Sequence, residues 1–312
     1  MVKKFGIAGT AVLLALASVP TSQAQQLEPI RVNRIPIASY APADLAMERG
    51  WFKEEGLDFT VAAVAPGAVA MQGLLSNKLE LIYSSLDAAM KARANGFDVV
   101  IVSNNNVAHT KLPDGGALLA RADSGITSLK QLEGKTVIVN VLNNVNWAFT
   151  REAVLRAGGD PAKVQFLEIG FPQMNDAVIA GRAAAASNTE PFTTVGMEAG
   201  LKPISFMFTE VQPGLNIAGW VARGNWVKEH PKAVAAFRKV LQRSIDLLEH
   251  NEAERIASIV KYTQLKEELV RKAVFDPWQT KLDPEDLQKQ VAIYQRHGMI
   301  DKVFDVKTMI AP

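Results

Sequence analysis

The chain has 312 residues, with 34 basic and 32 acidic side chains and no cysteine. This near balance of charge gives no reason to expect nucleic acid or an anionic membrane surface as a partner. The lack of cysteine excludes a disulfide framework, a thiolate metal site, a cysteine nucleophile and a lipid-modified cysteine at a cleavage site.

Residues 1–24 have the pattern of a secretory signal peptide. Lys3 and Lys4 give a positive start, Phe5 to Val19 is an apolar run too short to span a bilayer, and Ser22-Gln23-Ala24 fits a small-x-small cleavage site. Removing this segment leaves 32 basic and 32 acidic residues, so the mature chain is formally neutral. No later stretch is long and apolar enough for a transmembrane helix. We therefore expect an exported protein of a bacterial periplasm.

Strand and helix patterns alternate along the mature chain to about residue 220. The first unit is a strand at 30–38 and a helix at 42–53, in which Pro42 suits the first turn and Gly50 and Gly56 mark the end. Further strands are expected at 57–64, 79–84, 99–103, 117–121, 136–141, 164–169, 183–187 and 217–222. Further helices are expected at 69–75, 86–94, 144–157, 173–180, 231–250, 252–262, 266–275 and 284–297. The alternation predicts an α/β fold with mainly parallel sheets.

The order helix, glycine, strand, helix and short strand occurs twice, at 45–85 and at 150–190, which indicates two similar α/β lobes. The chain would cross between the lobes near 112–118 and 214–222, and two crossings make a hinge around a central cleft. The expected division is 25–113 and 219–312 for lobe 1 and 114–218 for lobe 2. Because helices begin where strands end, this cleft is where a polar or anionic solute is expected to bind.

Candidate ligand-binding residues lie where predicted strands end or predicted helices begin. Almost all are neutral hydrogen-bonding groups, which can hold a carboxylate or sulfonate with the help of helix N-termini. In lobe 1 they are Ser39, Tyr40, Gly67, Ala68, Ser84, Ser85, Asn104, Asn106 and His109. In lobe 2 they are Asn143, Asn144, Asn146, Trp147, Phe171, Asn188 and Glu190.

Several of these residues also have purely structural explanations. Ser39 and Asn144 can be helix caps, and Trp147 can be core packing. His109 is the one histidine in the predicted cleft, and such a residue is more often a hydrogen-bond donor than a catalyst. Glu190 can accept a hydrogen bond from a cationic ligand group or pair with an arginine of the protein.

Enzyme motifs are absent from the sequence, which has no Gly-x-Ser-x-Gly, His-Glu-x-x-His or Gly-x-Gly-x-x-Gly. Gly134-Lys135-Thr136 fails as a phosphate loop because Leu129 stands where the upstream glycine is required. No two histidines have the helical spacing of a metal-binding pair. We expect no catalysis, no metal and no cofactor. The alternative left open is an exported hydrolase or lyase that uses His109 with Ser84 or Ser85.

A set of short motifs occurs in a characteristic order. They are Ala46-Met47-Glu48-Arg49-Gly50-Trp51-Phe52-Lys53-Glu54-Glu55-Gly56-Leu57, Ser124-Gly125-Ile126 with Leu129, Leu132-Glu133-Gly134-Lys135, Leu155 with Gly158 and Val164, Glu190-Pro191-Phe192, and His230-Pro231. In these motifs the chain resembles periplasmic solute-binding proteins of ABC importers, in the group that handles taurine, alkanesulfonates, nitrate and pyrimidine precursors. The resemblance covers nearly the whole mature chain. It implies a type II periplasmic binding protein fold that closes on its ligand and docks on a membrane permease.

The chain departs from this group where Gly-x-x-Asp-Ala commonly precedes the third strand of each lobe. Lobe 1 has Asn77-Lys78-Leu79-Glu80-Leu81, and lobe 2 has Gly181-Arg182-Ala183-Ala184-Ala185. The resemblance therefore does not identify the ligand. A related pyrimidine-synthase branch uses a cysteine-rich motif and a sacrificial histidine, which a chain without cysteine does not match.

The function expected from these observations is capture of a small organic anion by a monomeric protein and its delivery to an ABC transporter permease. Tyr40, Trp147 and Phe171 favour a sulfonate or a carboxylate, with aromatic acids such as phthalate among the candidates. A third possibility, beside the enzyme, is a receptor that senses the solute and reports to a membrane kinase or chemoreceptor.

Overall fold

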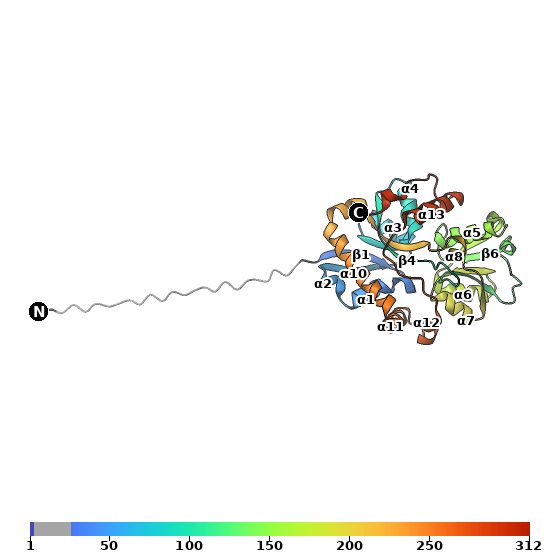
Figure 1. Ribbon diagram of the computed structural model, residues 1–312, viewed down its shortest axis with the longest axis horizontal. Coiled ribbons are helices and arrows are strands. Elements are labelled where there is room, and N and C mark those ends of the chain that lie inside the picture. The colour runs from blue at the N-terminus through green and yellow to red at the C-terminus, as the bar shows by residue number, and fades with distance from the viewer. Residues whose placement is uncertain (3–25) are drawn as a thin grey trace.

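The computed structural model of the protein describes residues 1–2 and 26–312, so nearly all of the predicted signal peptide lies outside the described residues. The described chain forms two α/β lobes that lie side by side (Figure 1). Within this part of the chain, no helix is long and apolar enough to cross a membrane.

Lobe 1, on the left in Figure 1, contains two small sheets. Strands β1 (Glu28–Arg34) and β2 (Leu57–Val64) pair in parallel. In the other sheet β10 (Asn216–Arg223) lies between β3 (Leu81–Ser85) and β4 (Val99–Val107) and is antiparallel to both. The helices that accompany these strands along the chain are α1 (Ala41–Glu48), α2 (Trp51–Glu54), α3 (Gly67–Leu75), α4 (Leu86–Ala94), α9 (Gly224–Glu229), α10 (Pro231–His250), α11 (Glu252–Thr263), α12 (Glu267–Lys272) and α13 (Pro284–Arg296).

Lobe 2, on the right in Figure 1, contains one five-stranded sheet of order β7-β6-β8-β5-β9. Its strands are β5 (Ala117–Arg121), β6 (Thr136–Val139), β7 (Gln165–Glu168), β8 (Ala185–Asn188) and β9 (Leu201–Ser205). Its helices are α5 (Val145–Arg156), α6 (Phe171–Ile179), α7 (Phe192–Glu198) and α8 (Met207–Val211).

Short 3-10 turns occur in both lobes, at η1 (Ala38–Tyr40), η2 (Leu129–Leu132), η3 (Pro161–Lys163) and η4 (Val306–Met309).

The predicted α/β fold with two lobes is confirmed, but the prediction of mainly parallel sheets is wrong. Four of the seven strand pairings in the described chain are antiparallel. All four involve β5 or β10, the strands that directly follow the two crossings between the lobes. A strand that enters a sheet from the other lobe therefore runs antiparallel to its neighbours in that sheet.

Several predicted elements have other bounds in the structure, and two of these differences have a clear local reason. The first strand ends at Arg34 instead of residue 38, because Pro36 lacks the N–H group that a sheet requires. The helix predicted at 42–53 is broken into α1 and α2 by Gly50, which takes a left-handed conformation with φ 71°. The chain thereby turns sharply before Trp51, whose side chain is buried.

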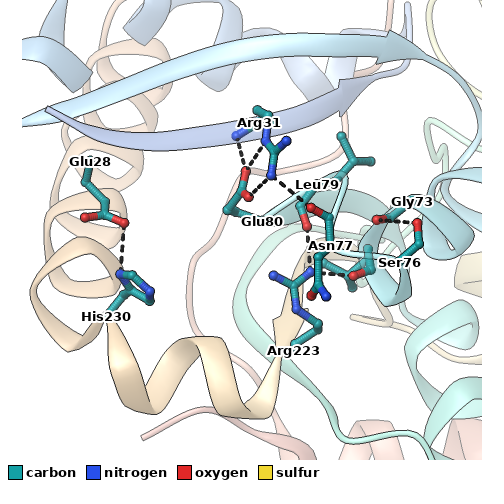
Figure 2. Close-up of polar contacts among 10 residues, drawn as sticks. Glu28, Arg31, Gly73, Ser76, Asn77, Leu79, Glu80, Arg223 and His230 are labelled. Atoms are coloured by element: carbon teal, nitrogen blue, oxygen red, sulfur yellow. Dashed lines mark hydrogen bonds and ion pairs between the residues drawn. The ribbon is translucent and has the colours of Figure 1, made fainter.

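The turn between α3 and β3, where lobe 1 lacks the Gly-x-x-Asp-Ala pattern, is held by an ion pair of its own (Figure 2). Glu80 accepts hydrogen bonds from the backbone N–H of Arg31 at 2.7 Å and from its guanidinium Nε at 3.0 Å. Arg31 also donates to the carbonyl of Asn77 at 2.9 Å, and Arg223 donates to the carbonyl of Leu79 at 2.7 Å. These contacts tie the turn to β1 and to the end of β10.

An aromatic cluster in the core of lobe 1 supports the strand ends that face lobe 2. The ring centroids of Tyr40 and Tyr83 lie 5.2 Å apart, and those of Tyr83 and Trp220 lie 5.4 Å apart. All three side chains are buried. Because these residues belong to η1, β3 and β10, their packing fixes the position of the three segments relative to one another.

Candidate functional site

A cavity of about 190 Å³ lies between the two lobes and is lined by residues of both. Its polar wall is formed by Ser39, Tyr83, Ser85, Asn106, Asn140, Asn144, Asn146 and Thr189. Its apolar wall includes Ile35, Ile37, Val64, Phe171, Phe208 and Ile217. A mostly apolar cavity with a few converging polar groups is typical of small-molecule sites.

Among the described residues, four helices of nine or more residues begin at this cavity: α3, α4, α5 and α6. Neither α3 nor α6 has a side-chain cap, and the first N–H groups of a helix have no partner within the helix. The positive ends of these helices therefore face the cavity. Gly67 makes this possible for α3, because a Cβ atom there would lie 2.0 Å from Oγ of Ser84.

The start of α5 presents fixed amide groups to the same cavity. Asn144 is the N-cap of α5, and its Oδ1 accepts a hydrogen bond from the N–H of Trp147 at 3.1 Å. Its Nδ2 donates to Oδ1 of Asn140 at 2.8 Å. Asn146 donates to Oγ of Ser187 at 3.0 Å, so the side chains on this wall are held in place before any ligand binds.

The two charged side chains of the cavity wall, among the described residues, are Arg34 and Asp87, and both are already paired. Arg34 donates through Nε and Nη2 to the two carboxylate oxygens of Asp44, each at 2.8 Å. Asp87 lies beside Lys91, with 3.1 Å between Oδ2 and Nζ. A bound anion would therefore meet helix N-termini and neutral donors in preference to an unpaired cation.

The structure brings half of the predicted residues to the cavity wall. They are Ser39, Gly67, Ala68, Ser85, Asn106, Asn144, Asn146 and Phe171. These residues come from six separate segments of both lobes, so only the fold places them together.

Tyr40 and Ser84 lie outside the cavity wall because other groups hold them. The Tyr40 hydroxyl donates to the carbonyl of Asn33 at 2.9 Å, and its ring belongs to the aromatic cluster of lobe 1. Ser84 is fully buried and donates to the carbonyl of Ser85 at 2.9 Å. Both side chains stabilise lobe 1 from behind the cavity.

Asn104 and His109 also lie outside the cavity wall. Asn104 donates to the carbonyl of Gln279 at 2.8 Å and so holds the C-terminal segment against β4. Nε2 of His109 lies 3.0 Å from the carbonyl oxygen of Phe275. This contact occupies Nε2 of the imidazole, and within the described residues no hydrogen bond joins His109 to Ser84 or Ser85, which the hydrolase or lyase alternative requires.

In lobe 2, Asn143, Trp147 and Asn188 do not reach the cavity wall. Asn143 takes a left-handed conformation with φ 54°, and its carbonyl accepts a hydrogen bond from Lys91. Trp147 packs under the guanidinium of Arg151, 4.6 Å from the ring centre. Asn188 is fully buried and donates to another side-chain amide within lobe 2 at 3.0 Å.

Glu190 lies behind the cavity and is only 4% exposed. It accepts hydrogen bonds from the N–H and Oγ of Thr194 at 3.1 and 2.9 Å and from the N–H of Val274 at 3.1 Å. No arginine takes part in these contacts. Burial raises the pKa of Glu190 to about 7, because it outweighs the hydrogen bonds, which lower the pKa.

Replacing Glu190 should therefore change how stability depends on pH. In the folded protein the carboxyl stays protonated up to about pH 7, whereas its ordinary pKa is 4.5. The contribution of this carboxyl to folding stability is fully present below pH 4.5 and is lost as the pH rises through about 7. The loss amounts to about 3 kcal/mol. Relative to the wild type, Glu190→Gln should gain this amount in unfolding free energy between about pH 4.5 and pH 8. Urea denaturation measures it, and a difference that is independent of pH would contradict it.

Sequence reasoning missed several residues of the cavity wall. They are Arg34, Tyr83, Asp87, Asn140, Thr189 and Phe208. Arg34 ends a strand and Asn140 follows one, but the predicted strands ran on to residues 38 and 141, so the rule used for the other candidates placed both residues inside strands. Phe208 could not be found in this way, because no element was predicted where α8 lies.

The two lobes, the two crossings and the cavity between them define a type II periplasmic binding protein fold. Residues 38–254, more than half of the chain, match the family model described as NMT1/THI5 like. The chain belongs to that family.

Solved structures of two periplasmic binding proteins share the fold. The periplasmic aliphatic sulphonate binding protein SsuA from Escherichia coli has a TM-score of 0.76 and 14% identity, over 91% of this chain and 97% of that one. The periplasmic nitrate-binding protein NrtA from Synechocystis has a TM-score of 0.73 and 14% identity, over 90% and 84%. By sequence, the chain is 24% identical over 253 residues to YtlA, a candidate binding protein of Bacillus subtilis. The match covers 80% of this chain and 75% of YtlA.

Proposed function

We propose that this protein is an extracytoplasmic solute-binding protein that captures a small organic anion and delivers it to an ABC transporter permease. The observation that carries the proposal is the cavity between the lobes, at which α3, α4, α5 and α6 begin. The similar proteins support it, because SsuA is an aliphatic sulphonate binding protein and NrtA is a nitrate-binding protein.

The proposed ligand is a sulfonate or a carboxylate with an apolar or aromatic body. One helix N-terminus contributes about 0.3 to 1 kcal/mol to binding of an anion, and up to ~2 kcal/mol when partly buried. A dissociation constant near 1 μM requires about 8 kcal/mol. Contact with Phe171, Phe208 and Ile217 must then supply the larger share, which a bare inorganic anion cannot obtain.

Capture requires the lobes to move, and the crossings at 112–118 and 214–222 are the proposed hinge. Residues 25–113 and 219–312 then move as lobe 1 against residues 114–218. The open form admits the solute and closure buries it between the helix starts. Because the cavity wall is complete within one chain, we propose that the protein acts as a monomer in the periplasm after removal of residues 1–24.

A thermal-shift screen of purified protein tests the proposal. The panel contains sulfonates, aromatic and aliphatic carboxylates, nitrate, pyrimidines and amines, and calorimetry then measures stoichiometry and affinity. We expect a sulfonate or carboxylate to bind one to one and to be recovered unchanged. Turnover of the hit, or saturable binding of amines alone, would contradict the proposal.

Asn144→Ala should weaken the hit of this screen by more than about 1 kcal/mol, roughly fivefold in affinity. The variant removes an amide from the cavity wall together with the N-cap of α5. Tyr40→Phe is the matched control, because the hydroxyl that it removes is bonded to the backbone outside the cavity. Calorimetry on both variants decides the point: unchanged affinity in Asn144→Ala would show that the ligand does not lie against α5.

A further inference from the structure

Helix α4 of lobe 1 holds the start of α5 in lobe 2 through two side chains one turn apart. Oδ1 of Asp87 accepts a hydrogen bond from the N–H of Val145 at 3.2 Å. Nζ of Lys91 donates to the carbonyl of Asn143. The two contacts lie on either side of Asn144, the N-cap of α5. Lobe 1 thus binds the backbone on both sides of the N-cap of a helix in lobe 2.

The carboxylate of Asp87 is suited to this position. It meets the first N–H of α5, where a negative charge complements the helix dipole. A hydrogen bond with an ionised partner is stronger than one between neutral groups. The side chain is only 1% exposed, so water competes little for the contact.

Asp87 lines the cavity, but neither of its carboxylate oxygens is available to bind a ligand. Oδ1 is bonded across the cleft, and Oδ2 is buried without a hydrogen bond, 3.1 Å from the ammonium of Lys91. The charges of the two side chains compensate each other. The contacts of this pair thus depend on the lobes being closed and do not involve the bound solute.

We propose that Asp87 and Lys91 form a clamp that stabilises the closed lobes without a ligand and thereby scales the affinity for every ligand by a common factor. Asp87 is then a positioning residue. If only the closed form holds the solute, the apparent dissociation constant is the intrinsic one divided by the closed fraction. The effect of the clamp on ligand affinity rests on the proposed function, whereas its effect on closure of the ligand-free protein does not.

Distance measurements on the ligand-free protein test the clamp. The chain has no cysteine, so Val69→Cys on α3 and Ile179→Cys on α6, both at exposed positions, can carry two spin labels. The test variant is Asp87→Asn with Lys91→Met, which removes both charges together and leaves no buried carboxylate unpaired. Lys53→Met, at an exposed lysine of α2, is the matched control.

Without added solute, the labelled parent should contain a closed population, and the double variant should lower the ratio of closed to open molecules at least tenfold. The control should match the parent, and near-identical circular dichroism should show that the double variant is folded. A parent without a closed population, or a double variant with the parent's distance distribution, would overturn the clamp and leave solute capture to be decided by the screen.

The same double variant should weaken every solute found in the screen by one factor, because it changes the closed fraction and not the ligand contacts. Calorimetry on two chemically different hits measures this. Unequal factors would assign Asp87 and Lys91 a direct contact with the ligand and would contradict a clamp.

Discussion

Ala68→Trp is expected to lower the affinity for the solute at least 100-fold while the fold remains intact. Ala68 lies in the first turn of α3 and lines the cavity of about 190 Å³. An indole in place of the methyl group would occupy the space of the ligand and cover the N-terminus of α3. Because Ala68 is only partly buried, the indole does not have to enter the core. Calorimetry measures the affinity, and the unfolding temperature should stay within a few degrees of the wild type.

Val69→Trp adds an indole one residue further along α3 and serves as the control. Val69 is 57% exposed and does not line the cavity, so this variant should keep the wild-type affinity. If Ala68→Trp bound the solute as the wild type does, the ligand could not lie between the lobes. If both variants lost binding equally, the effect would belong to α3 as a whole.

Arg34→Ala is expected to lower the free energy of unfolding by about 3 to 5 kcal/mol, the usual cost of leaving a buried charge without its partner. Asp44 is 3% exposed and takes two hydrogen bonds from the Arg34 guanidinium. Burial raises the pKa of Asp44 even with Arg34 in place. Without the guanidinium, the carboxyl must either remain charged in the core of lobe 1 or bind a proton. Urea denaturation at neutral pH measures the loss.

The double variant Arg34→Met with Asp44→Asn separates charge from packing. It removes both charges and keeps side chains of similar length, so it should recover most of the stability lost in Arg34→Ala. A single variant that costs less than about 1 kcal/mol would show that the pair behaves like an exposed ion pair, contrary to its burial. A double variant as unstable as the single one would assign the loss to packing.

Most of the fold could be predicted from the sequence, because periodicity and chain punctuation are local signals. Helices α4 and α10 and strands β2 and β5 have the bounds that their patterns indicate. Strand β9 was missed because Lys202 and Pro203 interrupt a run of only five residues. The antiparallel pairing of β5 and β10 was missed because strand direction depends on how the chain crosses between lobes, which no local pattern records.

The candidate site was predicted only by half, because a strand end identifies a segment and not the direction of each side chain. Ser85 lines the cavity, whereas Ser84 is buried behind it, as expected where neighbouring residues face opposite sides of a strand. Asn106 lines the cavity but Asn104 does not, although they are two residues apart. A shift in the pairing of β4 with β10 falls between them and breaks the alternation.

Inter-lobe distance during titration with the solute from the screen is the most direct test of capture by closure. The spin labels at positions 69 and 179 report it, and chromatography of the released solute reports its chemical state. We predict that the closed population rises in a saturable, one-to-one manner and that the solute is recovered unchanged. A distance distribution that saturating solute leaves unaltered, or conversion of the solute into a product, would contradict the account.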